Sequence, residues 1–190
     1  MKTDLSVAAP HSCGRRRFFE VTALAGGAGL LGSMLPGGAV RAGSETDILL
    51  LSCMDFRLAN ETEDYMTGQG LRDKYDHVIL AGASLGVLTD KYPAWGQAFR
   101  EHVDIAIKLH QIHKLVVIDH RDCGAYKVLL GEDFAKDPAK ETTIHETKMK
   151  ELSAIVKKDF PTLEVELLLM DLDGVVEKIG AGGHFTRIGR

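Results

Sequence analysis

The sequence predicts an α/β fold built on a central, mostly parallel sheet of about four strands. Four short, uninterrupted apolar segments support this, because such segments are typical of strands buried on both faces of a parallel sheet; they lie at 47–52, 77–80, 115–118 and 165–170. Helical periodicity separates the second segment from the third and the third from the fourth. Strands that alternate with helices indicate crossover connections and helices on both faces of the sheet, so we expect one Rossmann-like domain.

The two helices and a closing hairpin follow from local signals. The first helix is predicted over 93–112, since Pro93 suits a first helical turn. The second is predicted over 142–159 from its apolar residues at helical spacing. Asp173-Gly174 comes directly after the fourth strand and is typical of a tight hairpin turn. We therefore predict a short antiparallel edge strand at 175–179.

Composition excludes several classes of protein. The chain has 190 residues with 23 Lys+Arg against 27 Asp+Glu, a formal net charge of −4, and 45% hydrophobic residues. These values are ordinary for a soluble globular protein and exclude collagen-like, coiled-coil, wholly disordered and multi-span membrane proteins. The charge is not basic enough to indicate a nucleic-acid partner. The length allows one domain with, at most, an appendage.

Residues 1–42 have the composition of such an appendage. Arg15 and Arg16 are followed by Phe18 and Phe19, then by an apolar segment rich in Ala and Gly, and then by the small-residue cleavage pattern Val-Arg-Ala. This order resembles a twin-arginine-type signal peptide. We predict that 1–42 is this signal, that 43–190 is the functional domain, and that the protein is periplasmic or otherwise exported, without stable membrane insertion after cleavage. An uncleaved N-terminal anchor or amphipathic helix remains an alternative.

Two cysteines and a histidine follow the first and third predicted strands. Cys53 ends the first strand, and His120 and Cys123 end the third. The carboxyl ends of neighbouring parallel strands meet at one edge of the sheet, where binding sites form. Two thiolates and one imidazole make a catalytic zinc set with a fourth position left open, and sulfur with nitrogen selects zinc over magnesium or calcium. These three residues are predicted to bind one zinc ion per chain.

Asp55 and Arg57 follow Cys53 at steps of two. If this segment is extended, the three side chains point to one side. An arginine can hold a carboxylate through two hydrogen bonds, and a carboxylate so held can orient a zinc-bound water. Zinc lowers the pKa of that water from about 15.7 to roughly 7, which supplies hydroxide at neutral pH. Asp55 and Arg57 are therefore the predicted catalytic residues.

The pattern Cys-x-Asp-x-Arg followed by His-x-x-Cys resembles the β-class carbonic anhydrases over almost all of 43–190. The resemblance implies that Cys53, His120 and Cys123 bind zinc. It also implies that Asp55 and Arg57 form a dyad that gates or orients the fourth ligand. The implied reaction is the reversible hydration of carbon dioxide to bicarbonate by a zinc-bound hydroxide. The implied assembly is a homodimer or a higher homo-oligomer.

Departures from the family pattern leave alternatives open. Phe56 stands where the family usually has serine, and the apolar segment 80–83 stands where it commonly has Arg-Asn-Ala-Gly. An apolar entrance would suit a zinc hydrolase of carbonyl sulfide or carbon disulfide. A non-catalytic zinc-binding protein, with Asp55 as the fourth ligand, is a further alternative. A disulfide between Cys53 and Cys123 also remains open.

Other polar residues have no assigned role from sequence. Asp119, Arg121 and Asp122 flank the predicted ligands, and such residues are either solvated or support the ligands. A proton shuttle could be any one of four histidines: His77, His102, His145 or His184.

Overall fold

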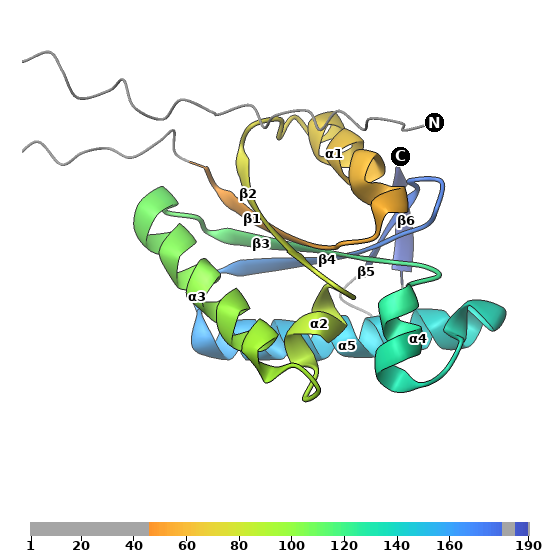
Figure 1. Ribbon diagram of the computed structural model, residues 1–190. Coiled ribbons are helices and arrows are strands. Elements are labelled where there is room, and N and C mark those ends of the chain that lie inside the picture. The colour runs from red at the N-terminus through yellow and green to blue at the C-terminus, as the bar shows by residue number, and fades with distance from the viewer. Residues whose placement is uncertain (1–45, 180–184, 190) are drawn as a thin grey trace, which may run out of the picture. The chain divides into compact units, whose positions relative to one another are not determined.

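The computed structural model describes residues 46–179 and 185–189 (Figure 1). The predicted signal peptide at 1–42 therefore lies outside the described residues. The strands are β1 Ile48–Cys53, β2 Tyr75–Leu80, β3 Lys114–His120, β4 Glu164–Met170, β5 Val176–Ile179 and β6 Phe185–Gly189. The helices are α1 Ala59–Gly68, α2 Ser84–Leu88, α3 Pro93–His110, α4 Gly124–Leu130 and α5 Pro138–Asp159, with short 3₁₀ turns at Phe56–Leu58 and Phe134–Lys136.

All described strands belong to one sheet with the order β2-β1-β3-β4-β5-β6. The first four strands run parallel, with Ser52 of β1 opposite both Ile79 and Ile118. This confirms the predicted α/β fold with a mostly parallel sheet. It also places β1 and β3 side by side, so their carboxyl ends meet at the same edge.

The hairpin after β4 is confirmed, but its strand is not the edge of the sheet. β5 pairs antiparallel with β4, and β6 pairs antiparallel with the outer side of β5. The short antiparallel strand predicted at 175–179 is therefore confirmed, and β6 extends the sheet by one strand beyond it. β6 was not predicted because its five residues follow the run Gly-Ala-Gly-Gly and are too few to show a period.

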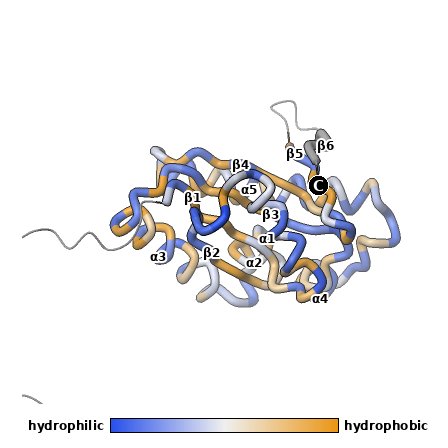
Figure 2. The backbone as a smooth tube through the Cα atoms, turned by 90° about the horizontal axis from the view of Figure 1, so that it is seen from above, coloured by the Kyte–Doolittle hydropathy of each residue, from blue (hydrophilic) through white to orange (hydrophobic). Residues whose placement is uncertain are grey.

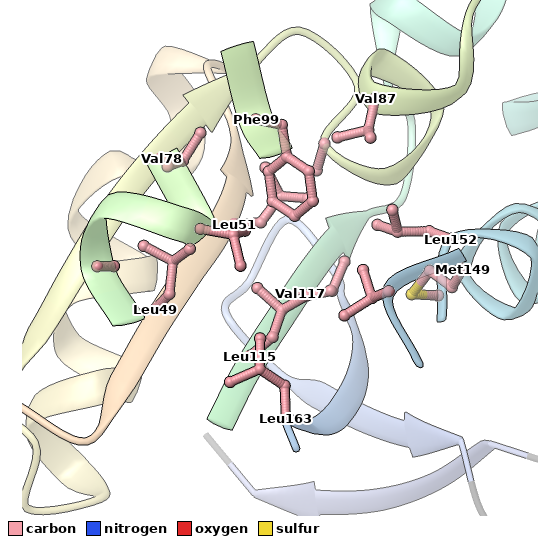
Figure 3. Close-up of a cluster of buried hydrophobic side chains, with 14 of the residues drawn as sticks. Leu49, Leu51, Val78, Val87, Phe99, Leu115, Val117, Met149, Leu152 and Leu163 are labelled. Atoms are coloured by element: carbon pink, nitrogen blue, oxygen red, sulfur yellow. The ribbon is translucent and has the colours of Figure 1, made fainter. Parts of the chain in front are cut away.

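Successive strand residues point to opposite faces of the sheet and build two apolar layers. On one face, Leu51 and Val117 contact buried residues of α3 and α5, including Phe99 and Leu152 (Figure 3). On the other face, Leu50 belongs to a second cluster that includes residues of α1. Helices therefore cover both faces, as predicted (Figure 1). In Figure 2, apolar (orange) and polar (blue) stretches follow one another along the chain.

Each of the two long helices, α3 and α5, begins at a proline. α3 begins at Pro93, as predicted, and ends before Gln111, which has a left-handed φ of 59°. α5 begins at Pro138, four residues before the predicted start, because the Asp137 carboxylate accepts a hydrogen bond from the Lys140 N–H at 3.1 Å. Among the described residues, no helix combines the length and the apolar character needed to cross a membrane.

Candidate metal centre

The adjacency of β1 and β3 brings three donor side chains together. The Sγ atoms of Cys53 and Cys123 and a ring nitrogen of His120 all lie within 4.8 Å of one another. The two sulfur atoms are 3.9 Å apart. Two sulfurs that each bind zinc at about 2.3 Å with tetrahedral angles lie about 3.8 Å apart. The spacing of the sulfurs therefore fits a single zinc ion.

The ring of His120 is oriented for coordination. Its Nδ1 lies 2.8 Å from the Arg121 carbonyl oxygen, so the Nδ1–H donates to that carbonyl and the lone pair is on Nε2. Nε2 is buried and has no hydrogen-bond partner within the described part of the chain. Leaving a buried polar nitrogen unpaired costs free energy, and a metal ion between the two sulfurs would pair it.

The two cysteines have opposite electrostatic environments. The hydrogen bond between the two cysteine side chains lowers the pKa of Cys53, with further contributions from His120 and from the Gly82 N–H, which lies 3.3 Å from the sulfur. The same pairing raises the pKa of Cys123. Both cysteines are free in this structure, so the disulfide alternative is not formed. The lowered pKa of Cys53 favours a thiolate, which is the form that binds metals.

Asp55 and Arg57 meet through a tight turn and not through an extended backbone. Asp55 caps a 3₁₀ turn that begins at Phe56, and this turn folds Arg57 back onto the carboxylate. Oδ1 of Asp55 accepts hydrogen bonds from the backbone N–H and from Nε of Arg57, both at 3.0 Å. Oδ2 accepts one from Nη2 at 2.8 Å. The segment turns instead of staying extended because the carboxylate satisfies the free N–H of the turn.

The Asp55 carboxylate lies beside the donor group. Its Oδ2 is 3.8 Å from Nε2 of His120. The compact set of donor atoms nevertheless contains only Cys53, His120 and Cys123 among the described residues. Because both Asp55 oxygens are bound to Arg57, this arrangement favours an open fourth position over Asp55 as a permanent ligand.

The Arg57 hydrogen bonds lower the pKa of Asp55 to about 2. An unfolded aspartate has a pKa of about 3.9, so the folded-state pKa is depressed. The contact therefore contributes stability above about pH 4, and this contribution is lost as the pH falls towards 2. A carbon-13 NMR titration is expected to show Asp55 ionised throughout pH 5–9. An Arg57→Gln variant should move the midpoint back up, and a midpoint above 4 in the unsubstituted protein would contradict the expectation.

A cavity of about 580 Å³ opens beside the donor group. Cys53, Asp55 and Cys123 contribute to its lining together with mostly apolar residues, which are Met54, Phe56, Ala81, Tyr92, Trp95, Gly124, Ala125, Val128 and Leu129. Phe56 projects outward with 87% of its surface exposed. The apolar entrance predicted from Phe56 is thus present, and it suits a small, weakly polar molecule.

The carboxylate of Asp119, the residue before His120, is buried and held by several hydrogen bonds. Asp119 is only 1% exposed and accepts hydrogen bonds from the N–H and Oγ of Ser84, at 3.0 and 2.6 Å. It also accepts from the hydroxyl of Tyr126 at 2.6 Å and pairs with Nδ1 of His145 at 3.0 Å. Ser84 lies two residues after Gly82, which donates to the Cys53 sulfur. Sequence could have flagged Asp119, because a carboxylate inside a strand buried on both faces needs partners.

No histidine of the described part lines the cavity. His145 is paired with Asp119. A ring nitrogen of His77 lies 2.7 Å from Oγ of Ser52, and burial lowers the pKa of the His77 ring. His102 hydrogen bonds the carbonyl of Ala98 in its own helix. His184 lies outside the described residues. The structure therefore singles out none of these four as a proton shuttle.

Known proteins match this chain in sequence and in fold. Residues 44–180 match the model of a protein family described as "Putative carbonic anhydrase". An uncharacterized protein of Rickettsia conorii is 45% identical over 136 residues, covering 72% of this chain and 73% of that protein. An uncharacterized protein of Rickettsia bellii is 43% identical over 136 residues, covering 72% and 83%. A tetrameric β-carbonic anhydrase of Sordaria macrospora has a similar fold, with a TM-score of 0.50 and 14% identity over 73% of this chain and 83% of that one.

Proposed function

The chain belongs to this carbonic anhydrase family, and from that membership we propose that it catalyses the reversible hydration of carbon dioxide to bicarbonate with one zinc ion per chain. The observation that carries the proposal is the donor group itself. Nε2 of His120 is buried without a partner, and it faces two cysteine sulfurs that are 3.9 Å apart. This set fits zinc and leaves one coordination position open.

Each residue of the site has a distinct proposed role. Cys53, His120 and Cys123 hold the metal, which acts as a Lewis acid and makes hydroxide available from water at neutral pH. Asp55 is ionised at neutral pH, and Arg57 lowers its pKa further, so its carboxylate can accept a hydrogen bond from the reacting water and orient it. Arg57 fixes the carboxylate through three hydrogen bonds. The apolar cavity admits carbon dioxide next to this group.

The same cavity supports a second candidate reaction. Its lining is almost entirely apolar, and Phe56 and Met54 are exposed at 87% and 67%. Carbonyl sulfide and carbon disulfide are linear molecules like carbon dioxide, with softer sulfur in place of oxygen, and their hydrolysis needs the same hydroxide nucleophile. We propose this reaction as the alternative on the same scaffold.

The test is stopped-flow hydration of carbon dioxide by the zinc-loaded full chain between pH 6.5 and 9. We expect turnover that needs zinc, rises with pH and disappears in a Cys53→Ala variant. Absence of turnover, with one zinc bound per chain, would refute carbon dioxide as the substrate. Release of hydrogen sulfide from carbonyl sulfide or carbon disulfide would then identify the alternative substrate. If no sulfide is released above the blank, the remaining alternative is a non-catalytic zinc-binding protein.

We also propose that the protein is a homodimer or a higher homo-oligomer. Phe56, Val128, Met54 and Tyr92 line the cavity and are exposed at 87, 70, 67 and 47%. A cluster of exposed apolar residues is typical of a surface that another subunit covers. The similar fold from Sordaria macrospora is described as tetrameric. Light scattering of the purified protein would show a multiple of the chain mass.

Export remains a proposal from the sequence. Residues 1–42, with Arg15 and Arg16, are proposed to direct the chain to the periplasm through a twin-arginine-type pathway. A mature chain that begins at Gly43 in the periplasmic fraction would be the expected observation.

A further inference from the structure

The guanidinium of Arg57 is held on two sides. Asp55 binds Nε and Nη2, while Asp122 binds the remaining edge. Nη1 of Arg57 donates to Oδ2 of Asp122 at 2.7 Å, and Nη2 donates to the Asp122 carbonyl oxygen at 2.9 Å. Arg57 therefore joins the segment after β1 to the segment that carries the ligands His120 and Cys123.

Asp122 has a backbone conformation that requires support. Its φ is 54°, in the left-handed region that residues with a side chain rarely adopt. Glu141, in the first turn of α5, provides that support, because its Oε1 accepts a hydrogen bond from the Asp122 N–H at 2.6 Å. Glu141 is only 4% exposed, and its other oxygen lies 3.5 Å from Nη1 of Arg121. A buried glutamate is thus committed to holding the turn between two ligands.

We infer that Asp122, held by Glu141, is a positioning residue for Asp55, because it anchors Arg57 and so keeps the Asp55 carboxylate beside the donor group instead of inside it. Oδ2 of Asp55 is already 3.8 Å from Nε2 of His120, so a small rotation would bring it to the open position. An Arg57 bound only to Asp55 would follow that rotation. With Asp122 in place, Arg57 is tied to the ligand segment and holds the carboxylate back.

This role can be separated from a role in stability. The side chains of Arg57 and Asp122 are 34% and 49% exposed, and ion pairs this exposed contribute little to folding. Asp122 also does not line the cavity beside the metal centre, so its removal leaves the walls that admit substrate unchanged. The inference rests on the proposed zinc-dependent function.

The test compares Asp122→Gly with Asp122→Asn in the cobalt-substituted full chain. Glycine adopts the left-handed conformation freely and removes the contact with Arg57. Asparagine tolerates the same conformation and keeps an oxygen that can accept from Nη1. The matched control is Asp133→Ala, which removes the same charge from a carboxylate that binds Lys127 at 2.9 Å. The probe is azide, an anion that takes an open coordination position and changes the visible spectrum of cobalt.

For Asp122→Gly we expect azide affinity and kcat for carbon dioxide hydration to fall about tenfold, with KM little changed. Removing a negative charge would by itself strengthen anion binding, so weaker azide binding cannot be a simple charge effect. Asp122→Asn should restore most of both values, and Asp133→Ala should show only the charge effect.

Equal azide affinity and kcat in Asp122→Gly and Asp133→Ala would overturn the inference. An unsubstituted cobalt protein that neither binds azide nor hydrates carbon dioxide would instead refute the proposed function. If Asp122→Gly does not retain cobalt, Asp122→Ala, which also removes the contact with Arg57, is judged by the same comparison.

Discussion

Replacing Cys123 with serine is expected to lower the affinity for zinc by more than about a hundredfold and to remove carbon dioxide hydration. Loss of a group that merely supports a ligand costs about 10–100-fold in metal affinity, so loss of a direct ligand should exceed that range. A serine hydroxyl stays protonated at neutral pH and cannot replace the thiolate. Cys123 is also buried and packs in a cluster with Leu85 and Tyr126, so the position leaves no room for a compensating ligand.

The affinity is measured by competition with a chromophoric chelator. Cys13→Ser is the matched control, because Cys13 lies in the predicted signal peptide and is expected to have no part in the metal centre. Zinc affinities that are equal in the two variants would contradict the assignment of Cys123 as a ligand.

The largest effect on stability is expected for Asp119→Ala. The substitution removes the shared acceptor of donors on Ser84, Tyr126 and His145. The mutual contact of the Ser84 and Tyr126 hydroxyls, at 3.0 Å, can satisfy only one of these donors. Removing one member of a buried, hydrogen-bonded polar group costs about 3–5 kcal/mol. We therefore expect the free energy of unfolding to fall by that amount, as measured by urea denaturation in one fixed metal state.

Asp104→Ala provides the comparison for this measurement. Asp104 forms an exposed ion pair with Lys108 one helical turn away, and such pairs contribute about 0.3–0.5 kcal/mol. The two aspartates thus differ mainly in burial. Equal losses in the two variants would show that the hydrogen bonds of Asp119 contribute no more than a surface pair does.

The sequence predicted the sheet and the donor group because both depend on strong local signals. Buried parallel strands appear as continuous apolar segments, and the ends of neighbouring strands must lie together. Cys53, His120 and Cys123 are therefore adjacent because β1 lies beside β3, which the prediction assumed and the structure confirms. Their roles as zinc ligands stay a prediction until metal binding is measured.

Other features of the site depend on contacts between segments that are distant in sequence. The 3₁₀ turn at Phe56 forms because the Asp55 carboxylate caps it, and an alternating pattern of residues does not reveal that cap. The left-handed Asp122 is held by Glu141, which comes from α5, nineteen positions later. The hydrogen bonds of Asp119 also come from distant segments, since its four partner groups lie in α2, α4 and α5. Such partners become visible only when the helices have been placed.

The donor group also has a consequence for the entropy of the unfolded chain. Cys53 and Cys123 are separated by 70 positions, and one metal ion would connect them. An ion that stayed bound to both cysteines on unfolding would restrict the unfolded chain by up to about 4 kcal/mol, in the chain-entropy model that is used for covalent cross-links. A bound ion would then cross-link the ends of β1 and β3, in addition to its part in the reaction.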